Sequence, residues 1–329
     1  MRAAFYERYG AAADVLEVGE VPELPVGPGE VRVAVAASGV NPSDVKARAG
    51  SRGGPMPFER IVPHSDGAGT VAAVGAGVPA DLVGQRVWVW EAQWLRAWGT
   101  AAEYTVVPAR CVAPLPAAAS FEEGACLGIP ALTAHRCLLA DGPVDGKTVL
   151  VSGATGRVGA YAVQLAKQGG ATVLATVGSD EKAELATKLG ADHVFDYRAE
   201  GLADQVLDVT GGRGVDRIVD AEFGVNLAAD TTMLAANGVI ATYASMADPK
   251  PTAAVYPLML KNATLRFVLV YDMPEEAKQQ AAGDVNALLA AGRLQHQVAL
   301  TVPLGDIATA HQTIERNAAQ GCVIVRPGG

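Results

Sequence analysis

The sequence lacks long apolar runs and clusters of basic residues. Its first twenty residues, MRAAFYERYGAAADVLEVGE, have no apolar core of signal-peptide length, and no later stretch reaches the roughly 18 unbroken apolar residues that a membrane-spanning helix needs. The formal net charge is −9, which argues against general affinity for nucleic acid or an anionic membrane. We therefore expect a soluble, cytoplasmic protein with no nucleic-acid partner and no membrane partner.

Cysteine is scarce and follows no motif. The four cysteines, Cys111, Cys126, Cys137 and Cys322, stand singly, with no C-x-x-C and no paired Cys and His spacing. This pattern indicates neither a disulfide framework nor a structural zinc lobe. We expect buried, reduced thiols.

Two styles of sequence alternate along the chain, which at 329 residues and 50% hydrophobic composition can form more than one core. Up to about residue 120, short β-like runs such as GEVRVAVAASGV are broken by Gly and Pro, as in a small antiparallel, barrel-like domain. From Gly146 onward, strands alternate with helices, which implies βαβ crossovers and a parallel sheet. The tail returns to the first style. We expect an α/β protein in which residues 123–271 form a nucleotide-type domain inserted between 1–122 and 272–329.

The segment LVSGATGRVGAYAVQLAK, residues 150–167, contains the clearest motif. A strand pattern precedes three glycines, and a helical pattern follows them. Gly153 permits a tight turn, Gly156 lets the backbone approach a pyrophosphate, and Gly159 lets the helix pack closely on the strand. We interpret the segment as a dinucleotide-binding loop; the alternative is a purely structural turn.

The end of the second strand, VLATVGSD, favours NADPH. An NAD site usually has a carboxylate here that accepts from the ribose 2′-OH, whereas this strand ends in Val177, Gly178 and Ser179. Ser179 can donate to a 2′-phosphate, and Lys182 supplies a positive charge. Alternatively, Asp180 and the next acidic residue offset Lys182 or contact the ribose, and SDEK is only a capped helix start with Ser179 as N-cap.

Four motifs in order give the chain a family resemblance: SGVNPSDVKARAG (38–50), VPHSDGAGTVAAVG (62–75), GIPALTAHR (128–136) and SGATGRVG (152–159). They resemble the quinone oxidoreductase and ζ-crystallin branch of the medium-chain dehydrogenase/reductase superfamily. The resemblance implies a GroES-like β-barrel catalytic domain and a Rossmann domain with a doubly wound parallel sheet. It also implies a homodimer or homotetramer and zinc-independent reduction by NADPH.

The zinc alcohol dehydrogenases of the superfamily provide a contrast. They have an early cysteine and a Gly-His-Glu segment, where this chain has no cysteine in SGVNPSD and has HSD in place of the second motif. The ligand histidine aligns with Ser65, so His64 is displaced by one position. Zinc needs a convergent set of ligands. We expect no metal, and a structural or pocket-lining role for His64.

The resemblance also implies particular cofactor and substrate contacts. Asn41 would lie near the nicotinamide and the substrate, or else only form an Asx-turn before Pro42. Thr133 would bond toward the nicotinamide side or merely pack in its helix. The sixth expected strand of the nucleotide-type domain contains Phe267 to Val270. The remaining implied cofactor contacts are the pyrophosphate loop Gly153, Ala154, Thr155, Gly156, Arg157, Val158 and Gly159, the 2′-phosphate ligands Ser179 and Lys182, Tyr197 on the adenosine side, and Tyr243, Ser245, Phe267 and Leu269 near the nicotinamide.

Three positions depart from the family pattern. Lys46 stands where relatives have a substrate-pocket tyrosine; it could polarise a carbonyl oxygen or donate a proton, or it could point outward. Arg157 replaces a loop glycine and could reach a phosphate or remain exposed. Asn317 replaces an arginine of some relatives, which leaves Arg316 as a displaced phosphate ligand.

Together these features predict hydride transfer from NADPH to a quinone or a similar conjugated carbonyl. Such acceptors need no zinc, because conjugation delocalises the developing charge onto oxygen. The alternatives are an NADPH-dependent enal, enone or haloacrylate reductase and, in another class, an NADPH-binding protein with little turnover.

Overall fold

The computed structural model describes residues 1–51 and 53–328. The chain forms two compact units: the first comprises residues 1–129 and the chain from Lys278 onward, and the second comprises residues 130–277. Both unit boundaries fall within helices, α4 (Gly128–Leu139) and α10 (Glu275–Ala290). The division at 122/123 and 271/272 inferred from the sequence stays a prediction. Within the part of the chain described, no helix is both long and apolar enough to cross a membrane.

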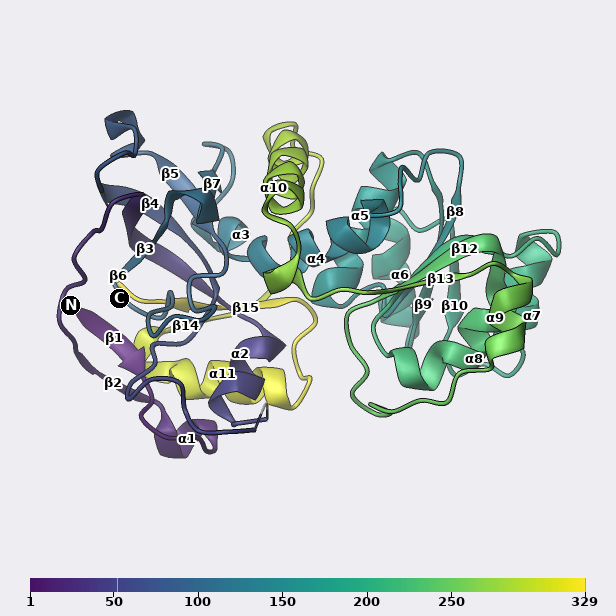
Figure 1. Ribbon diagram of the computed structural model, residues 1–329, viewed down its shortest axis with the longest axis horizontal. Helices are drawn as coiled ribbons and strands as arrows, with labels where there is room; N and C mark the ends of the chain where they lie inside the picture. Colours follow the sequence, from purple (N-terminus) through teal and green to yellow (C-terminus); the bar gives the residue numbers. More distant parts are fainter. Residues whose placement is uncertain (52, 329) are drawn as a thin grey trace. The chain divides into compact units, whose positions relative to one another are not determined.

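The second unit is a six-stranded parallel sheet covered by helices. Its strands are β8 (Thr148–Ser152), β9 (Thr172–Val177), β10 (His193–Asp196), β11 (Val215–Asp220), β12 (Leu234–Thr242) and β13 (Thr264–Phe267). Its helices are α5 (Arg157–Gln168), α6 (Asp180–Leu189), α7 (Leu202–Val209), α8 (Phe223–Met233), α9 (Val255–Leu260) and the 3₁₀-helix η3 (Val270–Asp272). Helix α5 lies beside α6, and α7 lies beside α8. Figure 1 shows the two pairs on opposite faces of the sheet, as in a doubly wound fold.

The strand order of this sheet is β10-β9-β8-β11-β12-β13, and every neighbouring pair is parallel. Strand order therefore reverses between β8 and β11, since the chain first builds outward on one side of β8 and then on the other. Strands such as β8 and β9 are buried almost throughout because helices cover both faces. A crevice at the carboxyl ends of strands beside such a reversal is where open α/β sheets bind ligands.

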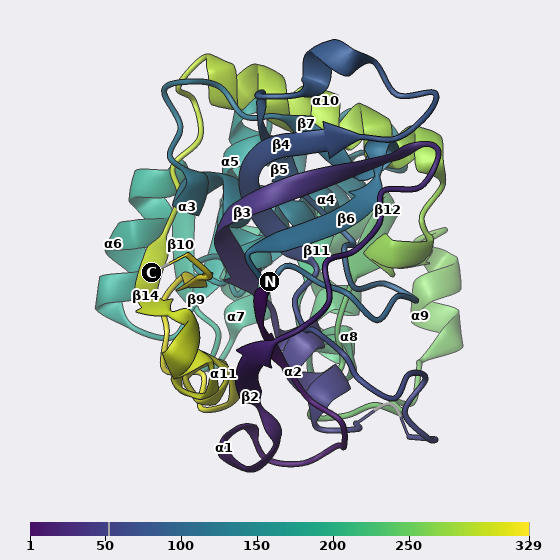
Figure 2. The same ribbon diagram turned by 90° about the vertical axis from the view of Figure 1, so that its left-hand side faces the viewer.

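The first unit is built on a second, mainly antiparallel sheet. Its strands run in the order β14-β15-β3-β4-β5-β7, and β6 pairs with β3; among the residues described, β14 and β15 form the only parallel pair of this sheet. Figure 2 shows the long β3 between β4 and β6, and α11 beside β14. The strands are β3 (Glu30–Val40), β4 (Asp66–Val74), β5 (Arg86–Val89), β6 (Tyr104–Pro108), β7 (Val112–Pro114), β14 (Val298–Pro303) and β15 (Cys322–Arg326), with β1 (Arg2–Phe5) and β2 (Glu17–Glu20) as a separate pair.

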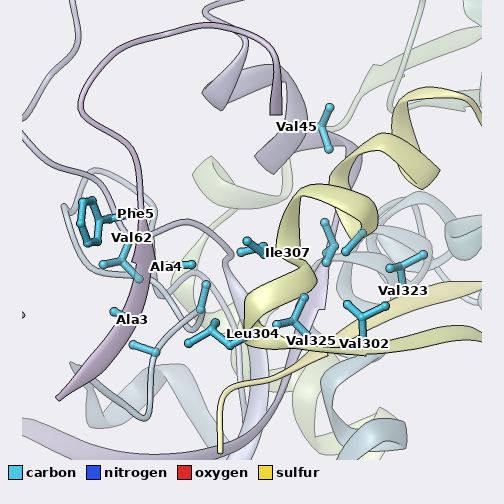
Figure 3. Close-up of a cluster of buried hydrophobic side chains, with 14 of the residues drawn as sticks. Ala3, Ala4, Phe5, Val45, Val62, Val302, Leu304, Ile307, Val323 and Val325 are labelled. Carbon is cyan, nitrogen blue, oxygen red and sulfur yellow. The ribbon is translucent and has the colours of Figure 1, made fainter. Parts of the chain in front are cut away.

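Short helices complete the first unit. They are α1 (Ala12–Val15), α2 (Pro42–Arg48), α3 (Phe121–Ala125), α11 (Ile307–Glu315) and the 3₁₀-helices η1 (Ala80–Leu82), η2 (Ala109–Cys111) and η4 (Leu304–Asp306). One buried cluster joins both ends of the chain: Figure 3 shows Ala3, Ala4 and Phe5 near Leu304, Ile307 and Val325. Because the N-terminal strand and the C-terminal segment share this core, the pieces on either side of the second unit fold together.

Two expectations can be judged at this level. All four cysteines are free and buried, as predicted. The prediction that the sixth strand of the nucleotide-type domain runs through Val270 is wrong: β13 ends at Phe267, and Val270 begins a 3₁₀-helix. The apolar run TLRFVLVY is longer than the segment that pairs with β12.

Candidate functional site

The glycine-rich loop lies at the carboxyl end of β8, directly before α5. Gly153 has a φ of +64°, a left-handed conformation that glycine adopts without strain. A Cβ on Gly159 would lie only 2.2 Å from the carbonyl oxygen of Gly153, so the helix packs too closely on the loop for any side chain there. These two glycines have the structural roles that a dinucleotide-binding loop requires, and the loop therefore fits such a cofactor.

Hydrogen bonds fix the loop and limit which amides a phosphate could use. The N–H of Ala154 donates to the carbonyl of Thr176 at 3.1 Å, and the N–H of Gly156 donates to the carbonyl of Gly153 at 2.9 Å. Gly156 is the N-cap of the 12-residue α5 and has no side chain to cap it. The positive end of the helix dipole therefore faces the loop and attracts an anion. The side chains of Ala154 and Thr155 are buried.

The end of β9 holds the residues expected at the ribose. Ser179 is the N-cap of α6, and its Oγ accepts from the N–H of Lys182 at 3.3 Å. Ser179 therefore caps this helix, and both side chains remain at the surface of the unit; whether they also bind the cofactor stays a prediction. Tyr197 follows β10 and donates its N–H to the carbonyl of Val177 at 3.1 Å. These residues from β9 and β10 lie together at one edge of the sheet.

The residues expected near the nicotinamide lie after β12 and around the end of β13. Ser245 Oγ accepts from the N–H of Gly224 at 2.9 Å and donates to the carbonyl of Asp248 at 2.5 Å, so its hydroxyl holds a turn. Burial raises the pKa of Tyr243 far above its usual value. Phe267 and Leu269 are exposed, at 69% and 52%.

Sequence reasoning missed a polar group at the point where strand order reverses. Asn226 on α8 donates through Nδ2 to Ser152 Oγ at 3.2 Å and to Asp220 Oδ1 at 2.7 Å. Ser152 ends β8 and Asp220 ends β11, so one amide joins the two strand ends. Burial raises the pKa of Asp220. The available signal was a polar residue at the end of each apolar strand.

In the first unit, Asn41 is buried and its amide orientation is fixed. It is the N-cap of α2 and forms a capping box with Asp44, whose Oδ2 accepts from the Asn41 N–H at 2.8 Å. Asn41 Nδ2 donates to Asp66 Oδ2 at 2.7 Å. An ionised Asp66 can only accept, which agrees with the amide nitrogen facing it. Asn41 therefore caps α2 directly before Pro42, and its role toward a cofactor or substrate stays a prediction.

Asp66 joins Asn41 to the start of α4. Both of its carboxyl oxygens lie 2.9 Å from the N–H of Ile129, and a Cβ on Gly128 would lie 2.0 Å from Oδ1. Burial raises the pKa of Asp66 well above its usual value, while the hydrogen bonds from Asn41 and Ile129 oppose the shift. Asp66 was not among the residues expected in the site, because no local sequence pattern indicates its contact with Asn41.

A chain of hydrogen bonds in this unit fixes the protons on two buried histidines. Thr100 Oγ1 donates its single proton to the backbone carbonyl of Asp66 at 2.5 Å, so Ser38 must be the donor in the 2.7 Å contact with Thr100. Ser38 Oγ then accepts from His64 Nδ1, 2.8 Å away. The free Nε2 of neutral His64 therefore accepts from His311 Nε2 at 2.9 Å.

The lowered pKa values of both histidines agree with neutral imidazole rings. Burial lowers the pKa of His64 to about 3, and burial together with the neighbouring His64 and Arg48 lowers the pKa of His311 well below its usual value. His64 also has a φ of +78°, which is uncommon outside glycine. Its ring thus belongs to a buried network. Over residues 1–51 and 53–328, no three His, Cys, Asp or Glu residues form a group that could hold a metal, and the donor set does not fit a zinc ion.

The remaining predicted residues divide between the units. Lys46 lies half-buried on α2, in the same unit as Asn41. Thr133 is buried on α4, and its position falls in the second unit with the glycine loop. Arg157 is the first residue of α5 and is half-buried. Arg316 is exposed at the end of α11 in the first unit.

Comparison with known families matches both units. Residues 27–117 match the alcohol dehydrogenase GroES-like domain, and residues 158–285 match the zinc-binding dehydrogenase domain. A quinone oxidoreductase of Pongo abelii is 33% identical over 287 residues, 86% of this chain and 84% of its own. That of Lama guanicoe is 31% identical over 335 residues, 99% and 97% of the two chains. The chain belongs to the quinone oxidoreductase family of the medium-chain dehydrogenase/reductase superfamily.

Solved structures place the whole chain in the same fold. An NAD-dependent alcohol dehydrogenase has a TM-score of 0.92 at 29% identity, covering all of both chains. A mycobacterial protein complexed with NADPH has a TM-score of 0.86 at 29% identity, covering 99% of this chain and 100% of its own. A 2-haloacrylate reductase has a TM-score of 0.86 at 28% identity over both complete chains. The family fold, a GroES-like sheet with a Rossmann-type sheet, is therefore the fold of this protein.

Proposed function

We propose that the protein is an NADPH-dependent oxidoreductase that transfers a hydride to a quinone or a similar conjugated carbonyl. The observation that carries the proposal is the glycine loop at the carboxyl end of β8, where Gly153 turns with φ +64° and Gly159 lies against it without room for a side chain. Membership of the quinone oxidoreductase family supports the same chemistry.

The end of β9 supports NADPH rather than NADH. Val177, Gly178 and Ser179 place no carboxylate where an NAD site accepts from the ribose 2′-OH. The N-terminus of α6 and Lys182 supply positive charge at this position, and the structural relative with bound NADPH has the same fold. Since another structural relative is an NAD-dependent enzyme, NADH is the competing cofactor in the test below.

The acceptor side is assigned to the first unit. When bound, the cofactor supplies a hydride from C4 of its nicotinamide. Asn41, held by Asp66 and Asp44, has one amide N–H left to donate to an acceptor oxygen. Lys46 lies on the same helix and supplies a positive charge that stabilises developing negative charge on that oxygen or a proton that completes the reduction. Thr133 is proposed to contact the cofactor on the nicotinamide side.

We propose that the reaction needs no zinc. The matched family includes zinc-binding dehydrogenases, yet Asn41 lies in the segment where those enzymes have a cysteine, and His64 is committed to Ser38 and His311. A conjugated acceptor fits these residues, because it spreads the charge left by hydride addition without a Lewis acid.

A second acceptor class is favoured by one comparison. The 2-haloacrylate reductase matches the complete chain, and an activated alkene accepts hydride by the same conjugate addition as a quinone. A third outcome is tight NADPH binding with little turnover.

We propose further that the protein is a cytoplasmic homodimer or homotetramer. β13 is an edge strand of its sheet, and the adjacent α9 exposes Tyr256, Met259 and Leu260, the last at 86%. An open strand edge beside exposed apolar side chains is a typical subunit interface. Four free cysteines are consistent with a reducing compartment.

Steady-state oxidation of NADPH and of NADH, with EDTA present, against a panel of quinones and a panel of enones tests the proposal. We expect turnover of NADPH with quinones that EDTA does not reduce. Preference for enones would select the second acceptor class. Binding of NADPH without turnover on either panel, or loss of activity in EDTA, would contradict the proposal.

A further inference from the structure

Arg198 occupies a position that the sequence did not single out. It is the second residue after β10, and its guanidinium reaches back to the neighbouring strand, where Nη2 donates to the carbonyl oxygen of Gly178. Gly178 is the first residue after β9. The side chain thus crosses from the end of one parallel strand to the end of the next.

The end of β9 is the position at which this fold distinguishes the two dinucleotides. β9 is the second strand of the unit, and the residues after such a strand contact the 2′ position of the adenosine ribose. We propose that Arg198 recognises the 2′-phosphate of NADPH and so determines the preference for NADPH over NADH. This inference rests on the proposed function and names a residue that distinguishes NADPH from NADH.

The guanidinium is held in place before any ligand arrives. Its Nε donates to Asp196 Oδ1 at 3.1 Å, Nη2 also lies 3.3 Å from Asp196 Oδ2, and the backbone N–H of Arg198 donates to Oδ1 at 3.0 Å. The hydrogen bonds from Arg198 lower the pKa of Asp196, so the pair stays ionised at neutral pH. A side chain already fixed in one conformation loses little entropy when it binds a phosphate.

Part of the guanidinium remains open to a ligand. Nη1 of Arg198 donates to no atom of the residues that the structure describes, and the side chain is 57% exposed. Arginine binds phosphate oxygens through two N–H groups at once. Nη1 therefore provides the donors that the contacts to Asp196 and Gly178 leave unused.

The surrounding residues leave room for the ribose end of the cofactor. A Cβ on Gly178 would lie 2.7 Å from Cε1 of Tyr197, so the ring lies directly against the glycine and needs it to lack a side chain. The Arg198 guanidinium lies 5.4 Å from the centre of this exposed ring. Arg198 and the ring of Tyr197 thus lie close to Ser179 and Lys182 at the ends of neighbouring strands. The positive charge suits the 2′-phosphate, and the flat ring suits the adjoining adenosine.

Binding of 2′,5′-ADP and of 5′-AMP to the full-length protein tests the proposal without turnover. Both probes lack the nicotinamide, and they differ only in the 2′-phosphate. Isothermal titration calorimetry is performed on the wild type, Arg198→Ala and Arg198→Lys. Arg213→Ala is the matched control, because Arg213 is also an exposed arginine of this unit paired with a nearby aspartate, Asp216. Thermal unfolding of each variant confirms that it is folded.

We expect Arg198→Ala to weaken binding of 2′,5′-ADP by about ten- to hundredfold, the effect of losing a charge-assisted hydrogen bond, and to leave binding of 5′-AMP unchanged. Arg198→Lys should retain part of the preference, and Arg213→Ala all of it. A wild type that prefers 2′,5′-ADP with an Arg198→Ala variant that keeps the preference would overturn the role of Arg198 and leave the NADPH assignment standing. A wild type that binds both probes equally would overturn the NADPH assignment as well.

Discussion

The two sheets of the molecule hold their candidate functional groups in different ways. In the parallel sheet, the groups are mainly backbone and helix ends at neighbouring strand ends: the turn at Gly153, the start of α5 and the start of α6. In the antiparallel sheet, they are buried side chains that hold one another, with Asn41 on Asp66 and His64 on His311.

This difference determines how each region responds to change. A site built from backbone groups is lost when a substitution prevents the backbone from adopting the required conformation. A buried polar network is destabilised when removal of one side chain leaves its hydrogen-bond partner unsatisfied. In the parallel sheet, we therefore expect glycine substitutions to reduce stability and cofactor binding most. In the antiparallel sheet, we expect the largest loss of stability when one hydrogen-bond acceptor or one histidine is removed.

The largest effect is expected for Gly159→Val. Its Cβ would lie 2.2 Å from a backbone carbonyl that cannot move without opening the loop, so we expect a loss of more than about 3 kcal/mol of stability together with loss of NADPH binding. Urea unfolding and fluorescence titration measure the two effects. Gly283→Ala is the control, because Gly283 lies within α10 with nothing within 4 Å and should gain about 0.5–1 kcal/mol. Normal NADPH binding by Gly159→Val would contradict the backbone account of the loop.

Asp66→Ala comes next. It leaves Asn41 Nδ2 and the N–H of Ile129 without their acceptor in a buried environment, which should cost about 3 kcal/mol at roughly 1–3 kcal/mol per group. Asp192→Ala is a matched control: Asp192 accepts from Val173 and Lys167, but it is partly exposed, and the loss there should be about 1 kcal/mol or less. Equal losses in chemical unfolding would show that burial is not what makes the Asp66 network important.

The paired histidines predict acid sensitivity. The pKa of His64 is about 3 in the folded protein against 6.5 for the free side chain, so the unfolded state binds more protons between these values and stability falls as pH drops through this window. One such group contributes a slope of about 1.4 kcal/mol per pH unit. We expect His64→Gln to flatten the dependence of unfolding free energy on pH by about this amount.

The variant must be compared with the wild type because Asp66, Asp220 and Asp230 have raised pKa values. These three groups make stability increase as the pH falls, which is opposite to the effect of His64. Urea unfolding at pH 6.5, 5.5 and 4.5 gives both slopes. Parallel slopes for the two proteins would mean that His64 is not held neutral by burial.

The smallest effect is expected for Ser179→Ala. Loss of this N-cap should lower the free energy of unfolding by about 1 kcal/mol. It should also weaken the binding of NADPH. Ser120→Ala is the control: Ser120 caps α3 in the other unit with the same contact, accepting from Glu123 at 3.2 Å. It should show the same loss of stability with unchanged NADPH affinity. If both variants bind NADPH like the wild type, Ser179 serves only as a cap.

The sequence predicted the parallel sheet and its loop well, and the polar network poorly, for a physical reason. A strand, a glycine turn and a helix are determined by neighbouring residues, so the motif around Gly153 could be interpreted locally. The contact of His64 with His311 joins residues 247 positions apart, and no local pattern indicates it. Arg198 was missed for a related reason, because its partner Gly178 belongs to another strand.

Predictions that were only partly correct also depend on contacts between residues that are distant in the sequence. The strand expected through Val270 ends at Phe267 because pairing with β12 ends there, which an apolar run cannot show. The pairing of Asn41 with Asp66 joins residues 25 positions apart in two different motifs, and no local pattern indicates it. The roles proposed for Asn41, Lys46 and Thr133 stay predictions.

The most direct test of the account is the reduction of a quinone by NADPH deuterated at C4, measured in the presence of EDTA. If the parallel sheet delivers the cofactor and the reaction is zinc-independent hydride transfer, turnover will persist in EDTA and will be slower with the deuterated cofactor in single-turnover experiments. Loss of turnover in EDTA, or tight binding of NADPH with no transfer of deuterium or hydrogen to any acceptor, would contradict it.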